Sequence, residues 1–144
     1  MSRLRTASPY VLGVALILAG LNHFLNQGFY EPLIPGWVGS PRFWVVSSGF
    51  AEIAVGALVL PRRTRVLGAT LAALLLIAVF PGNLTQAVNA EGGLKAAIAY
   101  LRLPLQVPLI WWALSVRRDA RDRARAGASD GPAASASGTR AIFR

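Results

Sequence analysis

Four apolar segments constrain this chain more than any other feature of its sequence. They are Tyr10–Leu25, Phe43–Leu60, Val66–Ala87 and Leu103–Val116. A membrane-spanning helix needs about 20 mostly apolar residues, with a lower limit near 17. Allowing the shorter first and fourth segments to extend, we expect spans at about residues 10–27, 43–60, 66–87 and 98–116. The sequence therefore predicts an all-α, transmembrane four-helix bundle.

The composition agrees with a membrane location. Hydrophobic residues make up 54% of the 144 residues, and charged residues only 15%, against about 25% in an average soluble domain. The alternative is a soluble four-helix bundle, whose helices would carry a polar stripe at helical period. Residues 71–80 read Leu-Ala-Ala-Leu-Leu-Leu-Ile-Ala-Val-Phe and carry no such stripe. The pattern favours lipid around the helices.

The basic residues divide unevenly between the two ends of the predicted spans. Three basic residues lie at one end: Arg42, Lys95 and Arg102. The other end carries Arg3, Arg5, Arg62, Arg63, Arg65, Arg117, Arg118, Arg121, Arg123, Arg125, Arg140 and Arg144. Cytoplasmic loops of membrane proteins carry the excess of Lys and Arg. Both termini are therefore predicted to be cytoplasmic, in a multi-pass protein of the cell inner (plasma) membrane. The net charge of +9 then reflects topology, and no nucleic-acid partner is expected.

Two regions of different composition follow one another along the chain. Residues 1–118 are predicted to form the four-span membrane domain, and residues 119–144 a disordered cytoplasmic tail, because the end of the chain is rich in Ala, Ser, Gly and Pro. The N-terminal segment resembles a secretory signal peptide, but neither a Cys nor an Ala-x-Ala cleavage site follows it. We therefore expect an uncleaved first span.

Each predicted span carries a polar residue on the face that can pack most closely against its neighbours. The small residues on these faces are Gly13, Gly20, Gly49 and Gly56, and the polar residues are His23, Glu52, Asn83, Arg102 and Gln106. Helices in lipid associate through small residues and interhelical hydrogen bonds. We therefore expect the glycines to mark the packing positions and the polar residues to form one buried cluster.

Glu52 is a costly residue to place inside a membrane span. A carboxylate at membrane depth costs on the order of 2.5–3.5 kcal/mol on insertion scales, so its side chain is expected to face the bundle interior. Depths counted at 1.5 Å per residue place His23 and Gln106 near Glu52, and Asn83 and Arg102 in a layer closer to the outside. One interpretation is structural, with the cluster holding the helices together. The other is a proton relay or a site for a ligand headgroup such as a quinone.

Absent residue types exclude several kinds of chemistry. The chain has no cysteine and one histidine, so it cannot form structural disulfides, carry thiol redox chemistry on its own side chains or ligate an iron–sulfur cluster. No metal site of its own is expected, and no covalently bound cofactor.

Four short motifs occur in order on the four spans. They are Gly20-Leu-Asn-His23, Gly49-Phe-Ala-Glu52-Ile-Ala-Val-Gly56, Pro81-Gly-Asn83 and Arg102-Leu-Pro104-Leu-Gln106. Over roughly residues 8–118, this ordered set resembles the DoxX-like family of small four-span integral membrane proteins. That family includes a subunit associated with thiosulfate:quinone oxidoreductase, and proteins linked to membrane-bound thiol and oxidative-stress partners. The resemblance implies a bundle fold and an association with redox proteins, and it identifies no catalytic residue.

Three functions from different classes remain open on this basis. The favoured one is an accessory or quinone-interacting component of a membrane-associated redox system, such as an oxidoreductase subunit that is not an enzyme on its own. The second is a non-enzymatic membrane scaffold or assembly partner. The third and least favoured is a small-solute transporter, because the four spans show no clear inverted repeat. The expected partners are the lipid bilayer and either a redox protein or a second copy of the chain.

Cysteine labelling tests the predicted topology. Because the natural chain has no cysteine, single cysteines introduced into 27–42 or 89–95 should react with an impermeant thiol reagent added outside intact cells. A cysteine at Thr64 should react only after the cells are opened. External labelling at Thr64 would contradict the predicted orientation.

Overall fold

The computed structural model describes residues 3–129, and all regular structure in this range is helical. The elements are α1 (Arg3–Leu25), α2 (Gln27–Tyr30), η1 (Glu31–Leu33), η2 (Gly36–Val38), α3 (Pro41–Val59), α4 (Arg65–Ala78), α5 (Phe80–Val88) and α6 (Gly93–Ser129), where η denotes a 3-10 helix. The stretches long and apolar enough to cross a membrane are Arg5–Leu25, Pro41–Val59, Arg65–Val88 and Ala96–Ser129. The predicted all-α class and the four candidate spans are confirmed.

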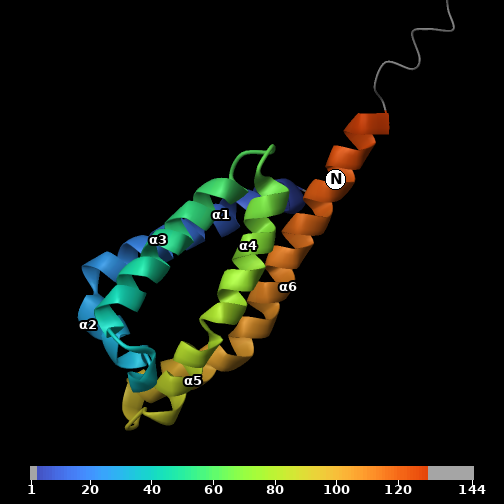
Figure 1. Ribbon diagram of the computed structural model, residues 1–144. Helices are drawn as coiled ribbons and strands as arrows, with labels where there is room; N and C mark the ends of the chain where they lie inside the picture. The colour runs from blue at the N-terminus through green and yellow to red at the C-terminus, as the bar shows by residue number, and fades with distance from the viewer. Residues whose placement is uncertain (1–2, 130–144) are drawn as a thin grey trace, which may run out of the picture.

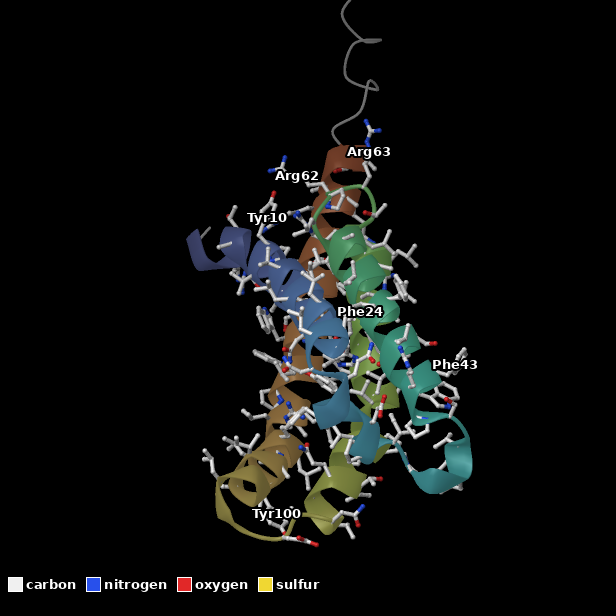
Figure 2. The ribbon with its side chains drawn as sticks, turned by 90° about the vertical axis from the view of Figure 1, so that its left-hand side faces the viewer. Tyr10, Phe24, Phe43, Arg62, Arg63 and Tyr100 are labelled. Atoms are coloured by element: carbon white, nitrogen blue, oxygen red, sulfur yellow. The ribbon has the colours of Figure 1, made fainter. Side chains whose placement is uncertain are left out.

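The long helices form two pairs that meet at one end of the molecule (Figure 1). α1 packs along α3, α4 packs along α6, and α3 contacts α4. We call the end with the tight 60–64 connection the turn end, and the end with α2, η1 and η2 the loop end. At the loop end η1 contacts both α3 and α5 and so bridges the two pairs. Figure 2 shows Arg62 and Arg63 at the turn end and Tyr100 toward the loop end.

Glycines bring the backbones of α1 and α3 into direct contact. A Cβ atom placed on Gly20 would lie 2.5 Å from the carbonyl oxygen of Gly49, and one on Gly56 would lie 2.6 Å from that of Gly13. Two helical turns separate the glycines on each helix, so each pair lies on one face. Because the helices are antiparallel, Gly13 meets Gly56 and Gly20 meets Gly49. All four predicted packing glycines therefore lie in this one interface.

Side chains from the start of α4 close the turn end. Buried Arg65 donates from Nε to the carbonyl oxygen of Val59 at 3.0 Å and from Nη2 to that of Leu60 at 2.5 Å. The hydroxyl of Thr64 donates to the carbonyl oxygen of Leu58 at 2.8 Å. The last carbonyls of a helix have no partner within it, and its C-terminus favours positive charge. Arg65, read from the sequence only as a topological charge, thus caps α3.

The third apolar segment is interrupted near Pro81, where the sequence predicts the loss of a helix hydrogen bond. Proline has no N–H group, and its ring clashes with the carbonyl four residues earlier. α4 accordingly ends at Ala78, and α5 begins at Phe80 with Pro81 in its first turn. The N–H group of Asn83 donates to the carbonyl oxygen of Val79 at 3.2 Å. The interruption leaves carbonyl groups at the end of α4 open to other donors.

The last helix is longer than the sequence predicts. α6 runs from Gly93 to Ser129, so residues 119–129 are helical and the predicted start of a disordered tail at 119 is wrong. Residues 130–144 of that tail lie outside the described residues. Arg and Ala are good helix formers, and Asp119 and Asp122 lie three or four residues from arginines, a spacing that stabilises helices. The 37 residues of α6 exceed the roughly 20 that cross a bilayer, and its end extends beyond the other helices (Figure 1).

Substitution of an interface glycine tests the α1–α3 contact. Gly56→Ala should lower the free energy of unfolding by about 1–3 kcal/mol, because the new Cβ cannot fit against the backbone of α1. Gly127→Ala is the matched control, since a Cβ there meets nothing within 4 Å and alanine favours the helix. Thermal unfolding in detergent measures both. An equal melting temperature for the two variants would contradict the contact.

Candidate functional site

A cavity of about 700 Å³ lies between the two helix pairs, toward the loop end. Its wall is mostly aliphatic and aromatic, with Tyr30, Trp37 and Trp44 at the loop end. The polar residues on the wall are Ser47, Ser48, Glu52, Asn83 and Arg102. Three of the five residues predicted to form the polar cluster therefore line one cavity.

The ring of His23 is fixed between α1 and α3. Its Nδ1 atom lies 3.1 Å from the carbonyl oxygen of Val45 and 2.9 Å from the hydroxyl oxygen of Ser48. A carbonyl only accepts hydrogen bonds, so Nδ1 carries the hydrogen that bonds Val45. The Ser48 hydroxyl donates to the same carbonyl at 3.0 Å, and the ring of Tyr30 lies 3.9 Å from that of His23, centroid to centroid. Only Nε2 of the imidazole remains uncommitted.

Glu52 faces this free ring nitrogen. Its Oε2 atom lies 3.7 Å from Nε2 of His23, which is within ion-pair range but too long for a hydrogen bond. Oε2 is buried and has no hydrogen-bond partner among the described residues. An unsatisfied buried polar group costs about 1–3 kcal/mol. The structure thus brings Glu52 to His23, as the sequence predicts, and leaves the carboxylate able to form a further hydrogen bond.

Gln106 is not brought to Glu52. Its side chain is buried, donates from Nε2 to the carbonyl oxygen of Leu76 and accepts a hydrogen bond from Nδ2 of Asn83 at 3.1 Å. Leu76 lies in the last turn of α4, where carbonyls lack helical partners. Because α6 packs along α4 and α5, Gln106 meets the interruption between these helices. Both ends of its amide are used there.

Arg102 lies on the wall of the cavity, and its hydrogen-bond and ring partners are uncharged. Nη1 donates to Oε1 of Gln86 at 3.1 Å, and the guanidinium carbon lies 5.5 Å from the centroid of the Phe29 ring, within cation–π range. No Asp or Glu oxygen lies within 4.0 Å of it among the described residues. A guanidinium has five N–H donors, so most of its capacity is unused.

Sequence reasoning missed several residues that hold this site. Ser48 lies one helical turn before Glu52, and this spacing could have identified it. Tyr30 reaches the site from the short helix α2 and Gln86 from α5, and no local sequence pattern predicts either position. Among the described residues, no three His, Asp or Glu side chains are grouped to hold a metal ion.

The arrangement offers one exchangeable proton and several free hydrogen-bonding groups. Since Nδ1 of His23 is committed to Val45, a second proton can lie on either Nε2 of His23 or the Glu52 carboxylate. Glu52 lines the cavity and His23 does not, so the Glu52 carboxyl is the group of this pair that can donate or accept toward the cavity. Arg102 supplies donors only.

Two substitutions distinguish Gln106, whose side chain is fully hydrogen-bonded within the protein, from Glu52, whose carboxylate is not. Gln106→Leu should cost about 1–3 kcal/mol of stability, because it leaves the Leu76 carbonyl and the Asn83 amide without their partner. Glu52→Gln should leave the melting temperature nearly unchanged, since the fold gives the carboxylate no hydrogen bond to lose. Thermal unfolding in detergent checks both. A larger loss for Glu52→Gln than for Gln106→Leu would contradict these roles.

Comparison with known proteins gives a family but no activity. No curated protein sequence and no solved structure matches the chain. The resemblance to DoxX-like proteins is not tested by these comparisons and stays a prediction. Residues 12–117, from α1 into α6, match a family defined by a domain whose function is unknown. The chain therefore belongs to the family described as domain of unknown function DUF8561.

Proposed function

We propose that this chain is a four-span protein of the cell inner membrane with both termini in the cytoplasm. In this proposal the cavity between the helix pairs binds a lipid-soluble ligand with a polar head, a quinone. The protein then serves as an accessory component of a membrane redox system, not as an enzyme on its own.

The outward faces of the four long helices support the membrane location. Leu18 of α1, Phe50 of α3, Ile77 of α4 and Val107 of α6 are all more than half exposed. Soluble monomers rarely expose apolar surface that is continuous over many residues. A lipid environment makes these faces favourable, and the predicted orientation follows from the division of basic residues.

The main observation behind this proposal is an apolar cavity with Glu52 on its wall. One oxygen of the Glu52 carboxylate is buried and has no hydrogen-bond partner among the described residues. Ligand sites are typically apolar hollows with a few convergent polar groups. A quinone ring fits such walls, and its two carbonyls need donors. Arg102 supplies N–H donors, and the Glu52 carboxyl supplies another when it is protonated. When the ring is reduced, the Glu52 carboxylate can accept a hydrogen bond from a hydroxyl.

A scaffold is the second candidate, and a different observation favours it. Gln106, Asn83 and His23 use their polar atoms on bonds between helices, as expected of residues that hold a bundle together. A scaffold would not need a ligand in the cavity.

Tryptophan fluorescence distinguishes the two candidates. Trp37 and Trp44 line the cavity, whereas Trp111 lies elsewhere, on the exposed face of α6. A short-tailed quinone should quench the emission saturably, and the double variant Trp37→Phe/Trp44→Phe should lose this saturable component. Trp111→Phe is the control and should retain it.

The carboxylate gives the second arm of this experiment. Glu52→Leu should weaken quinone binding at least about tenfold, because a hydrogen bond to a charged group contributes about 1.5–3 kcal/mol. A melting temperature no lower than that of the natural chain is the folding control. Quenching that never saturates, or saturates equally in the double tryptophan variant, would reject the ligand site and leave the scaffold.

A further inference from the structure

Exposed arginine side chains gather at the turn end of the molecule. Among the described residues they are Arg5 of α1, Arg62 and Arg63 of the 60–64 connection, and Arg118, Arg121 and Arg125 of α6. Figure 2 shows Arg62 and Arg63 at the end from which α6 projects. The acidic residues described at this end are Asp119 and Asp122. These six arginines, which we call the turn-end arginine surface, therefore give this end an excess of positive charge.

The arginines of this surface are not paired with acidic side chains of the chain itself. Within residues 3–129, no Asp or Glu oxygen lies within 4.0 Å of their guanidinium nitrogens, although Asp119 and Asp122 belong to the same helix as three of them. Arg118 donates from Nη2 to the hydroxyl oxygen of Ser115 at 3.4 Å. A guanidinium has five N–H donors, and its planar fork matches the oxygens of a phosphate group. Donors of this kind are available to an external phosphate.

The position of these arginines along α6 matches the headgroup layer of a bilayer. Val116 is the last large apolar residue of α6 and lies in the buried core. The headgroup layer is about 5–8 Å thick on each side of a hydrocarbon core of about 30 Å. At a rise of 1.5 Å per residue, Arg118 and Arg121 lie about 3 Å and about 8 Å beyond Val116. Both therefore reach the depth of lipid phosphates.

Exposed apolar side chains adjoin the arginines on the same helices. Trp111 is 64% exposed and precedes Arg118 by two helical turns, so the two residues share one face of α6. Leu67 is 55% exposed and lies at the start of α4, shortly after Arg63. A lipid whose chains cover Trp111 or Leu67 brings its own phosphate to the arginines. An acidic protein segment would use the charges and leave these apolar side chains uncovered, so the surface favours a lipid.

We propose that the turn-end arginine surface binds anionic phospholipids. Arg118 and Arg121 of α6, together with Arg62 and Arg63 of the connection, receive the phosphate, and the acyl chains lie along the exposed faces of α4 and α6. A phosphatidylcholine offers the same phosphate, but its choline cation is repelled by the surrounding guanidinium groups. This inference rests on the membrane location proposed above and does not depend on a quinone in the cavity.

Brominated lipids test the preference, because bromine on an acyl chain quenches the fluorescence of a tryptophan that it contacts. The protein used is Trp37→Phe/Trp44→Phe, whose remaining tryptophans are Trp111 and Trp112 of α6. It is reconstituted into mixed vesicles of phosphatidylglycerol and phosphatidylcholine, with one or the other lipid brominated. The ratio of the two quenching levels gives the preference for the anionic lipid beside α6. Both leaflets have the same composition, so the orientation of the protein does not affect this ratio.

The preference for phosphatidylglycerol should be about fivefold or more, as expected when at least one arginine acts near a membrane surface. Arg118→Gln/Arg121→Gln should lower it by at least about twofold, whereas lysine at both positions should preserve it, because the charge is kept. Arg42→Gln removes an exposed charge at the loop end and is the control, which should leave the preference unchanged. Inorganic phosphate should reduce the preference no more than chloride does at equal ionic strength.

Four results would overturn the proposal. Equal quenching by the two lipids would show that the arginines select no lipid, and an unchanged preference in Arg118→Gln/Arg121→Gln would show that these residues do not carry the selection. Suppression by inorganic phosphate beyond that by chloride would assign the surface to free phosphate. Quenching by neither lipid would reject the membrane location as well, which distinguishes that failure from the other three.

Discussion

The backbone contact between α1 and α3 is the constraint on which the rest of the structure depends. Gly13 and Gly20 face Gly56 and Gly49, and a Cβ at any of these positions would lie 3.0 Å or less from a carbonyl oxygen of the other helix. Because the helices approach this closely, the His23 ring reaches the Val45 carbonyl and the Ser48 hydroxyl on α3. The orientation of His23, and hence its approach to Glu52, follows from this contact.

The second helix pair is organised differently. α4 is interrupted before Pro81, and Gln106 of α6 bonds the carbonyl of Leu76 that the interruption leaves free. Arg65 caps α3 at the turn end, where the two pairs meet. Toward the loop end the pairs separate, with η1 bridging them, and the cavity lies between them. Closely packed pairs thus surround a space that neither pair fills.

The cluster that the sequence predicts as a unit is divided by this geometry. Asn83 and Gln106 are bonded to each other and to the interruption between α4 and α5. Glu52 and Arg102 line the cavity, and much of their hydrogen-bonding capacity is unused. A group that is already satisfied stabilises the fold, whereas a group left unsatisfied in a cavity is free to bind something else. The proposed ligand site rests on the second kind of group.

The spacing of residues along the chain predicts the spans and the packing faces of this structure. The features that it does not predict depend on contacts between residues far apart in the sequence. The four spans follow from apolar length, and the packing glycines from their repeat on one helical face. The pairing of Gln106 could not be predicted, because counting residues gives the depth of a side chain in the membrane but not which helix it faces. The sequence identifies Arg65 only as a charge that marks topology. Its second role depends on the free carbonyls of Val59 and Leu60, which only the folded turn brings within reach.

Disulfide trapping tests the central claim, that two closely packed helix pairs surround an open cavity. One cysteine pair joins positions on two closely packed helices: His23→Cys with Gly49→Cys, because a Cβ on Gly49 would lie 3.0 Å from that of His23. A second pair, Glu52→Cys with Asn83→Cys, joins residues of α3 and α5 that line the cavity. A disulfide needs Cβ atoms only about 3.5–4.5 Å apart, so mild oxidation should link the first pair and not the second. Linkage of Glu52→Cys to Asn83→Cys as fast as the first pair would show that the cavity is closed, and would contradict the account.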